Sequence, residues 1–503
     1  EVMCMKKMVA FMMVLALACS NVPAHLGYAN GTEAVYAAES VAIASADDLL
    51  AMEQNPGRNY YLSKDITVSA GTKLFQDRNT PFKGTLDGKG HKINGLRGGA
   101  LIGQAQNAKF QNLTLADVTL SEEAALVNQA RKCTFTKIKV SGKATGSSAG
   151  LVNSASDSTF TDCSSSVAFS IKNKKSADNA SDQSAAAAGI VLYGSGCKLK
   201  NCKNTGSFSL EAVMVYPTSV KAYGIAGSAQ SLENCKNSGN ITVKGTKPSD
   251  PDDGYYTDVH AAGIAGSYTT LKNCGNSGKI VASCTSVESG MRVSGVALSG
   301  TNSGKTHNSV ARCYNKGAVS ATGKCGRGIK ISGVTNETEA ATECYNTGKI
   351  SVDLKSQENV TVGGICSSTT FVQNCYNTGN VTLKGSGFAG GIAGIGAFLN
   401  SSKKKDAMYN YNCGTVKASG KNSFAGAIFG ELDGADDIGR PNARDNYYTS
   451  GKPYGHETTA WKPYMAKATK VSSITSRNCP KLSSKYWTYS SKHKRMILKN
   501  NKE

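Results

Sequence analysis

The sequence contains little of what catalytic metal sites require. Only six of its 503 residues are histidines. No His-Glu-x-x-His motif occurs, and the nearest match, His456 to Ala460, has alanine where the second zinc ligand would stand. Cys-x-x-Cys pairs are absent, and no Gly-x-Ser-x-Gly sequence stands in a strand-to-helix context. We therefore expect no metal, no cofactor and no catalytic residues.

Long hydrophobic runs are also scarce. The one strongly apolar run, residues 8–19, follows two lysines and is too short to span a bilayer as a helix. A small-x-small site comes next, which predicts a signal peptide over residues 1–38, cleaved after Ala37 or Ala38. Lipid attachment at Cys19 is the alternative. The chain contains no apolar run of the 18 or more residues that a membrane-spanning helix needs. We therefore expect a secreted or surface-attached protein.

Aromatic residues make up only 7% of the chain, and ten prolines stand against 54 glycines. The core must therefore consist mostly of Ile, Val, Leu, Ala and Cys, and the glycines indicate many short strands joined by turns. Sixteen cysteines in a secreted protein would ordinarily indicate a disulfide framework. Here the cysteines follow a sequence repeat, which indicates a positional role within each repeat unit.

The repeat is a Cys-x-Asn-x-Gly pattern that occurs six times. A glycine-plus-aliphatic segment precedes each copy, such as "GIAG" at 224 and 263, and an apolar-alternating segment such as "NITV" follows. Each unit therefore predicts strand, strand, turn, strand. The cysteines are separated by 33, 39, 39, 31 and 31 residues and are Cys202, Cys235, Cys274, Cys313, Cys344 and Cys375.

Such short strands cannot bury a hydrophobic face alone, but they can when each unit is one coil stacked about 4.8 Å from the next. The tightest units, from Leu101 to Leu126 to Leu151, are 25 residues long, a suitable length for one coil. We therefore predict an all-β fold, a right-handed parallel β-helix of about ten coils and roughly 50 Å in length.

The repeat assigns a structural role to each of its fixed residues. The cysteine is expected to point inward and to fill space as a free thiol. The asparagine two positions later is expected to take the left-handed conformation of a sharp corner and to hydrogen-bond to its equivalent one coil away. The next glycine completes the turn. The predicted ladder combines the six cysteines with Asn204, Asn237, Asn276, Asn315, Asn346 and Asn377.

The units resemble GLUG-motif repeats, in which an aliphatic-glycine strand precedes a sequence such as "NCYNTGNVT", found here at 374–382. The resemblance covers the chain from about Gly98 to Tyr448. It implies a bacterial secreted or surface β-helix, since such repeats occur in adhesins and in the non-catalytic parts of immunoglobulin-A-cleaving metallopeptidases. It implies little about activity, because one fold serves many functions.

The segment before the repeats, residues 39–99, predicts an N-terminal α/β cap and the first strands. It holds a short helix with Ser45 or Asp47 as the N-cap residue. Such a cap protects an edge that would otherwise pair with other chains. The expected apolar side of the helix consists of Leu49, Leu50 and Met52.

After the repeats of residues 100–450, a basic segment, residues 451–503, is expected to close the last coil. From residue 440 onward there are 14 Lys and Arg but only 3 Asp and Glu, out of a net charge of +21 for the whole chain. A basic surface of this kind favours an anionic cell-wall polymer as a partner.

The residue after each repeat cysteine should point outward, opposite to the cysteine. In the C-terminal coils this residue is tyrosine, whose ring and hydroxyl suit sugars. A purely shielding role for these rings is the alternative. A second candidate site is the loop at 244–260. The binding residues predicted in this way are Tyr314, Tyr345, Tyr376 and Tyr411 of the row, and Asp252, Asp253, Tyr255 and Tyr256 of the loop.

These observations favour a monomeric, adhesin-like protein that binds an extracellular glycan or a host matrix protein and recognises no specific nucleic acid. The alternative is a carbohydrate-active enzyme, a polysaccharide lyase or glycoside hydrolase, on the same scaffold. Such an enzyme needs two or more carboxylates converging on one face. No acidic residue recurs across neighbouring coils in the first-strand segments, so we do not expect an enzyme.

Overall fold

The computed structural model describes residues 40–173, 184–213, 218–246, 258–285, 289–356, 358–397, 407–433, 443–457 and 467–503. The expected signal peptide, with Cys19, Ala37 and Ala38, lies outside these ranges, and so do the loop residues Asp252, Asp253, Tyr255 and Tyr256. Within the described ranges, no helix is long and apolar enough to cross a membrane.

One repeat unit follows a coil with three straight sides. Strand β27 (Asp258–Ala262) is followed by β28 (Ala265–Lys272), and the chain then turns at a corner that carries the repeat cysteine. The third side consists of β29 (Gly275–Asn276) and β30 (Ile280–Cys284), after which β31 (Gly290–Ser294) begins the next coil. The predicted unit of strand, strand, turn and strand agrees with this path.

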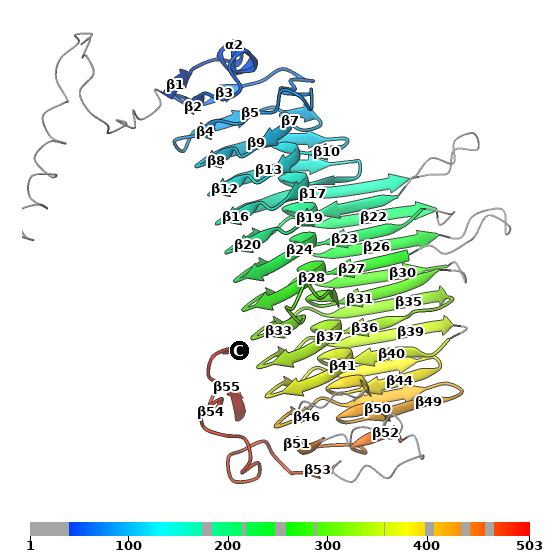
Figure 1. Ribbon diagram of the computed structural model, residues 1–503. Coiled ribbons are helices and arrows are strands. Elements are labelled where there is room, and N and C mark those ends of the chain that lie inside the picture. The colour runs from blue at the N-terminus through cyan, green and yellow to red at the C-terminus, as the bar shows by residue number, and fades with distance from the viewer. Residues whose placement is uncertain are drawn as a thin grey trace, which may run out of the picture. The chain divides into compact units, whose positions relative to one another are not determined.

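Equivalent strands of successive coils pair in parallel, so three sheets, here called A, B and C, run along the stack (Figure 1). This arrangement confirms the prediction of a parallel β-helix. Sheet C has ten strands, in agreement with about ten coils: β10 (Glu123–Ala124), β14 (Ser148–Ala149), β18 (Ala185–Ala188), β23 (Val220–Tyr223), β27, β31, β36 (Lys330–Ser332), β40 (Val360–Gly363), β44 (Gly387–Gly390) and β49 (Ser423–Gly426).

Sheet A follows sheet C in each coil and also receives strands from the N-terminal cap. Its strands are β1 (Ser40–Ile43), β2 (Asn59–Leu62), β4 (Thr85–Asp87), β7 (Ile102–Gln106), β8 (Lys109–Gln111), β11 (Val127–Arg131), β12 (Thr134–Thr136), β15 (Val152–Ser156), β16 (Thr159–Thr161), β19 (Val191–Ser195), β20 (Lys198–Lys200), β24 (Ala226–Glu233), β28, β32 (Ala297–Gly300), β33 (Ser309–Ala311), β37 (Thr335–Thr342), β41 (Cys366–Gln373), β45 (Ala393–Ala397), β46 (Ala407–Met408), β50 (Phe429–Asp433) and β52 (Tyr454–Glu457).

Sheet B begins directly after the cysteine corner, with a two-residue strand in most repeat units. Its strands are β3 (Ile66–Thr67), β5 (Lys92–Asn94), β6 (Arg97–Gly98), β9 (Thr114–Leu120), β13 (Lys139–Ala144), β17 (Ser164–Asn173), β21 (Lys203–Asn204), β22 (Phe208–Val213), β25 (Lys236–Asn237), β26 (Ile241–Thr246), β29, β30, β34 (Tyr314–Asn315), β35 (Val319–Cys325), β38 (Tyr345–Asn346), β39 (Ile350–Ser356), β42 (Tyr376–Asn377), β43 (Val381–Lys384), β47 (Tyr411–Asn412), β48 (Val416–Ser419), β51 (Arg444–Tyr448) and β53 (Lys467–Lys470).

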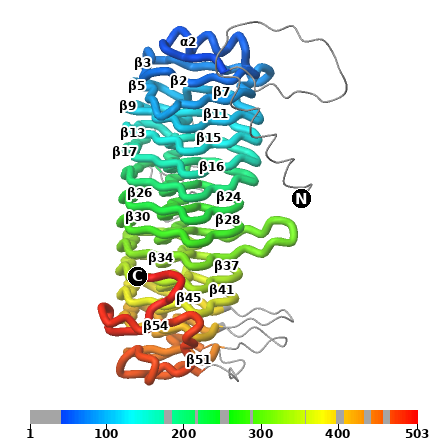
Figure 2. The backbone as a smooth tube through the Cα atoms, turned by 90° about the vertical axis from the view of Figure 1, so that its left-hand side faces the viewer, coloured from blue at the N-terminus to red at the C-terminus, as the bar shows by residue number. Residues whose placement is uncertain are grey.

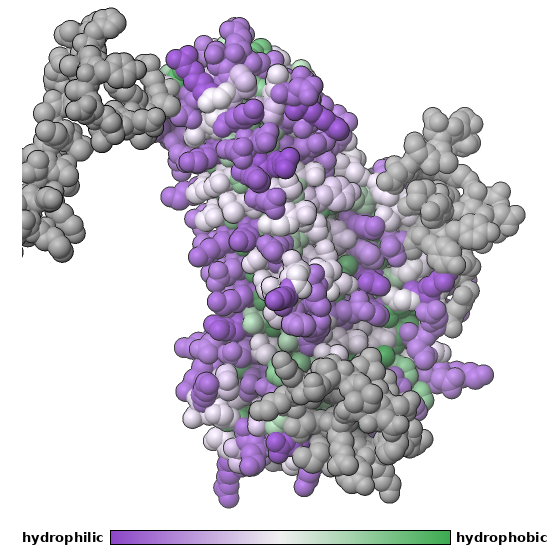
Figure 3. Space-filling view, in the orientation of Figure 1, coloured by the Kyte–Doolittle hydropathy of each residue, from purple (hydrophilic) through white to green (hydrophobic). Residues whose placement is uncertain are grey.

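Side chains alternate between the interior of the coil and its surface, as strands require. Aliphatic residues stack in the interior in register, as Ile241 does on Ile280 and Ile280 on Val319. Hydrophilic and intermediate side chains cover most of the described surface in Figure 3. Each coil therefore buries the apolar face of its neighbours, and the core is continuous along the stack.

The N-terminal helix, α2 (Ala46–Leu50), continues as the 3-10 turn η1 (Ala51–Gln54). Ser45 is its N-cap, since the Ser45 hydroxyl accepts a hydrogen bond from the Asp48 N–H at 3.1 Å. Leu49 and Met52 are buried in the core, whereas Leu50 is 44% exposed. Leu50 was expected on the apolar side, but a helix this short turns only one narrow face toward the coils.

The repeat asparagines lie inside the corner and hydrogen-bond to one another along the stack. One side-chain N–H of each donates to the side-chain oxygen of the next, with N···O distances of 2.7–2.9 Å. The other N–H donates to the carbonyl two residues later, as from Asn346 to Gly348 at 2.8 Å. Each amide is at most 1% exposed, so its burial is compensated. The series is Asn204, Asn237, Asn276, Asn315, Asn346, Asn377 and Asn412.

The left-handed residue of the corner is not this asparagine but the residue directly before the cysteine. The expectation from the sequence is wrong here, because the ladder asparagine lies in an extended two-residue strand paired with its neighbours. The chain turns two positions before that strand begins. The left-handed residues have φ between 51° and 56° and are Asn201, Asn234, Asn273, Arg312, Glu343 and Asn374.

The repeat glycines are required by the close approach of neighbouring coils. A Cβ at Gly239 would lie 1.9 Å from the carbonyl oxygen of Gly206 in the preceding coil. On the other side of the ladder, a Cβ at Gly263 would lie 2.1 Å from the Gly295 oxygen and 2.5 Å from Cγ of Asn276. None of these glycines has a positive φ. The expected conformational role in the turn is therefore replaced by a requirement for space.

The repeat cysteines are buried in the coil interior. The fourteen cysteines of the described ranges are all free, and each repeat thiol donates a weak hydrogen bond to the backbone, as Cys344 does to the Thr342 carbonyl at 3.2 Å. Burial raises the pKa of the Cys235 and Cys375 thiols well above its ordinary value, which keeps both protonated.

Replacing Asn346 with leucine, a side chain of similar shape, should destabilise the protein by about 1–3 kcal/mol, because the neighbouring ladder amides each lose a buried partner. Chemical denaturation monitored by circular dichroism measures the effect. Ser351→Leu, on the outer side of β39, is the control and should change stability by less than about 0.5 kcal/mol. Equal unfolding midpoints for the two variants would show that the ladder adds nothing.

The Gly239→Ala variant should lose about 1–3 kcal/mol of stability, because its Cβ can be accommodated only if two coils move apart. Gly57 is the matched control, since a Cβ there meets no atom within 4 Å. Thermal unfolding of both alanine variants tests the close-approach argument, which fails if Gly239→Ala melts together with Gly57→Ala.

Candidate functional site

The residues that follow the repeat cysteines form one register column at the start of sheet B, together with their register partners in the neighbouring coils that lack the repeat motif. Each member pairs with its equivalent in the next coil, so their side chains leave the corner in the same direction. The column changes along the stack from lysine and serine to tyrosine. From the second coil before Lys203 to the last tyrosine of the stack, its members are Lys139, Ser164, Lys203, Lys236, Gly275, Tyr314, Tyr345, Tyr376 and Tyr411, and the pairing continues to Thr114 at one end and Tyr447 at the other.

The four tyrosines stack on one another as the coil spacing dictates. Ring centroids of successive tyrosines are 5.2, 5.1 and 5.0 Å apart, with angles of 9–11° between the ring planes. Such offset stacking stabilises the protein by more than the hydrophobic burial of the rings alone would do.

Three of these rings are not available to solvent. Tyr345, Tyr376 and Tyr411 are fully buried, and only Tyr314 is partly exposed. The predicted open stripe is therefore wrong for three of its four members. Their side chains do leave the coil interior, but residues 472–503, which we call the strap, turn back along the stack and cover them (Figure 2).

A tryptophan anchors the strap over the stack. Trp487, in β54 (Trp487–Ser490), is 1% exposed, and its ring centroid lies 5.4 Å from that of Tyr411 and 5.9 Å from that of Tyr376. Its indole N–H donates to the side-chain oxygen of Asn374 at 3.0 Å. Strand β54 pairs with β55 (Arg495–Leu498) in an antiparallel hairpin. Aromatic stacking and one buried hydrogen bond thus hold this hairpin against the corner.

The phenol groups of the stack also bind the strap. The Tyr411 hydroxyl donates to the Met496 carbonyl at 2.6 Å, and the Tyr376 hydroxyl donates to the Glu503 carboxylate at 3.1 Å. Arg495 completes the pairing of that carboxylate. Buried phenols need hydrogen-bond acceptors, and the strap supplies them. The tyrosine row is therefore the surface against which the strap packs. The closure expected at the last coil comes from β53, which pairs with β51.

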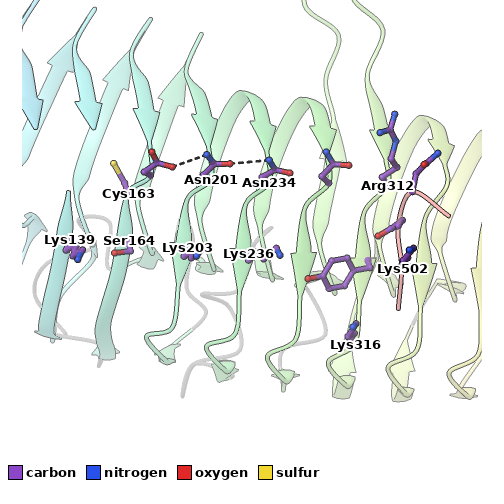
Figure 4. A pocket seen from close by; sticks show the side chains of 15 residues that line it. Lys139, Cys163, Ser164, Asn201, Lys203, Asn234, Lys236, Arg312, Lys316 and Lys502 are labelled. Atoms are coloured by element: carbon purple, nitrogen blue, oxygen red, sulfur yellow. Dashed lines mark hydrogen bonds between the residues drawn. The ribbon is translucent and has the colours of Figure 1, made fainter. Parts of the chain in front are cut away.

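Where the strap ends, the corner opens into a groove of about 930 Å³ (Figure 4). The lysine part of the column forms its floor, and Tyr314 lies at the end nearest the strap. The left-handed corner residues border it along one side, while Asn500, Asn501 and Lys502 of the strap border its end. The groove therefore occupies the same corner as the strap, over earlier coils.

Two side-chain hydrogen bonds link the corner residues of three coils along the groove. The Asn201 amide donates to the Asp162 carboxylate at 2.9 Å, and the Asn234 amide donates to the Asn201 side-chain oxygen at 3.2 Å (Figure 4). Unlike the inner ladder, these amides are partly exposed. Their remaining donors and acceptors can therefore reach a bound molecule.

The groove carries strong positive charge. Six cationic side chains line it, whereas Asp162 is its one carboxylate among the residues described: the cations are Lys139, Lys203, Lys236, Arg312, Lys316 and Lys502. The Lys316 ammonium lies 5.3 Å from the centre of the Tyr314 ring. Burial raises the pKa of Tyr314, so its phenol stays neutral and can donate a hydrogen bond.

Tyr314 owes its position to a glycine. A Cβ at Gly275, its partner in the preceding coil, would lie 2.1 Å from Cζ of the Tyr314 ring. The ring therefore leans over Gly275 toward the lysines of the earlier coils. This contact makes Tyr314 the boundary between the buried stack and the open groove.

The acidic side chains near the loop at 244–260 form no catalytic arrangement in the part of it that the structure describes. Asp258 and His260 lie on β27, with 3.8 Å between the Asp258 carboxylate and Nε2 of His260. The Tyr223 hydroxyl is 3.5 Å from Nδ1 of the same ring. Burial lowers the pKa of His260 to about 4, so the ring is neutral at pH 7. No group of three His, Cys, Asp or Glu among the described residues could hold a metal.

Of the residues that line the groove, the sequence analysis identified Tyr314 as a binding residue and missed the lysines and the corner asparagines. Lys139 and Asn201 carry no local motif that marks them as binding residues. The signal that would have found Lys139 is the register column itself, continued toward the N-terminus across units of unequal length. Asn201 stands two positions before the column member Lys203 and would have been found from the same alignment.

Comparisons with known proteins add little to this geometry. No family model matches the chain, and no curated protein matches it. A solved structure titled IgA1 Protease aligns with 18% identity over 62% of this chain and a TM-score of 0.33. The chain spans only 21% of the length of that protein. A putative immunoglobulin A1 protease from Bacteroides ovatus aligns with 12% identity, coverage of 92% and 93%, and a TM-score of 0.21. Likenesses this weak carry no argument about activity.

Trp487→Ala should release the strap without unfolding the coils, because sheets A, B and C do not depend on that indole. The free energy that holds the strap against the coils should fall by about 3–5 kcal/mol. Limited proteolysis should then remove the strap while circular dichroism still reports a folded β-helix. Tyr489→Ala, on the same strand but with a ring 51% exposed, is the control and should resist protease like the parent. Equal resistance of both variants would contradict the anchoring role.

Proposed function

We propose that this chain is a secreted bacterial surface protein that binds an extracellular glycan, as adhesin-like proteins do, and that the corner groove is its binding site. The N-terminal leader pattern in the sequence supports secretion. The observation that carries the binding proposal is the groove itself, a long open surface of partly exposed amides, ammonium groups and one tyrosine ring. Sugars are recognised by such combinations of hydrogen-bond donors and aromatic rings.

The groove replaces the full tyrosine row as the proposed contact surface. Only Tyr314 of that row presents part of its ring to solvent. The three buried tyrosines contribute indirectly, because they hold the strap whose end borders the groove.

Two alternatives predict different ligands or products. A glycoside hydrolase requires two carboxylates on either side of the scissile bond, whereas Asp162 is the one carboxylate found among the described groove residues. This arrangement favours binding over cleavage. A host matrix protein remains an alternative partner, and it would be recognised by failure on glycans together with binding to matrix-coated surfaces.

A glycan array probed with the mature chain tests the proposal, with neutral and acidic glycans both present. Tyr314→Ser should weaken binding to the bound glycans roughly three- to ten-fold, since one stacked ring contributes about 0.5–1.5 kcal/mol. Tyr489→Ser removes an exposed tyrosine outside the groove and should bind as the parent does. Absence of binding to any glycan would refute the proposal, and release of shortened oligosaccharides from a bound glycan would favour the enzyme.

A further inference from the structure

The cations of the groove are arranged in a line. Lys203 and Lys236 are register partners on adjacent coils, and Lys139 occupies the same column two coils before Lys203, with Ser164 between them. Because coils repeat every 4.8 Å or so, the ammonium groups recur at one and two coil spacings along the stack. Figure 4 shows Lys139, Ser164, Lys203 and Lys236 as a row across successive strands. A line of charge at this spacing matches an extended polymer that advances about one sugar ring per coil.

The lysines of this row lack the acidic partner that a few lysines of the described ranges have on a neighbouring coil. Lys244 lies 2.7 Å from the Glu211 carboxylate on the neighbouring coil, and Lys384 lies 3.2 Å from Asp353. Within the described ranges, by contrast, Lys139, Lys203 and Lys236 have no carboxylate oxygen within 4.0 Å. The protein therefore keeps unneutralised charge in the groove, although it pairs lysines across coils elsewhere.

The neighbouring part of the same corner already binds a carboxylate. The Glu503 side chain of the strap accepts a hydrogen bond from the Tyr376 hydroxyl and pairs with Arg495. Strap residues Asn501 and Lys502 then border the groove. A ligand in the groove would thus continue the line of the strap along the corner, over coils whose column residues are lysines in place of tyrosines.

We propose that the groove binds a linear anionic polysaccharide lying parallel to the stack, with its carboxylate or sulfate groups against Lys139, Lys203 and Lys236. The amides of Asn201 and Asn234 contact its hydroxyls, and Tyr314 packs against a sugar ring at the strap end. This inference rests on the proposed function and narrows it to acidic glycans. A single row of cations favours one extended chain over duplex DNA, which presents two charged strands across a wide groove.

The test measures binding of the full chain to polygalacturonate, dextran sulfate, neutral dextran and duplex DNA. The first two probes separate carboxylate from sulfate recognition, and tight binding to either supports the inference. Affinity should fall by at least ten-fold between about 0.05 and 0.5 M NaCl, because exposed charges are screened. The Lys203→Gln/Lys236→Gln variant should bind about ten-fold more weakly, because two of the three ion pairs with the polymer are lost.

The matched control is Lys324→Gln/Lys355→Gln, a second pair of exposed register partners on adjacent coils that lies outside the groove. It removes the same charge and should leave affinity within two-fold of the parent. If both variants bind equally weakly, or if duplex DNA binds as tightly as the acidic glycans, then binding depends only on the net charge of the protein. Either result would overturn the inference. Salt-insensitive binding to neutral dextran alone would overturn it while leaving the proposed function intact. If the protein binds none of these polysaccharides and no glycan on the array, both this inference and the proposed function are refuted.

Discussion

The structure depends on how closely successive coils approach at the asparagine corner. There the inner amides form an unbroken series of hydrogen bonds, and the glycines on both sides leave no room for a Cβ between neighbouring backbones. Every other column follows from this spacing, because residues that leave the corner in one direction must recur at the same interval. The stacked tyrosines, the line of lysines and the buried thiols are consequences of one repeated contact.

Features specified within one repeat unit could be predicted from the sequence. The coil, its three sides and the hydrogen-bonding role of Asn346 follow from a pattern that occurs six times, so each copy supports the others. The left-handed position was misassigned because Asn374 and Asn377 stand on either side of Cys375 and have similar local preferences. Only the pairing of the later asparagine in a strand distinguishes them.

Features that combine distant segments could not be predicted in the same way. Glu503 and Trp487 cover Tyr376, although both lie more than 100 residues later in the chain. No local sequence pattern predicts that contact. The groove was missed for a related reason. Lys203 and Lys236 are 33 residues apart, and Lys139 is further away. Repeat units of unequal length separate these lysines, so they line up only when the insertions after the third strand are left out of the alignment of the units.

The asparagine ladder also gives the stack an electrical direction. Backbone hydrogen bonds between coils alternate in direction: the Asn273 N–H donates to Ala311 in the next coil, whereas the Gly275 N–H donates to Cys235 in the previous one. Their dipoles largely cancel, as in other sheets. The side-chain amides do not alternate, because every hydrogen bond that a ladder amide donates to another coil goes to the asparagine of the following coil. From Asn204 to Asn412 the amide dipoles add head to tail, as peptide dipoles do in a helix. The buried corner therefore has a partial negative end toward the first coils and a partial positive end toward the last.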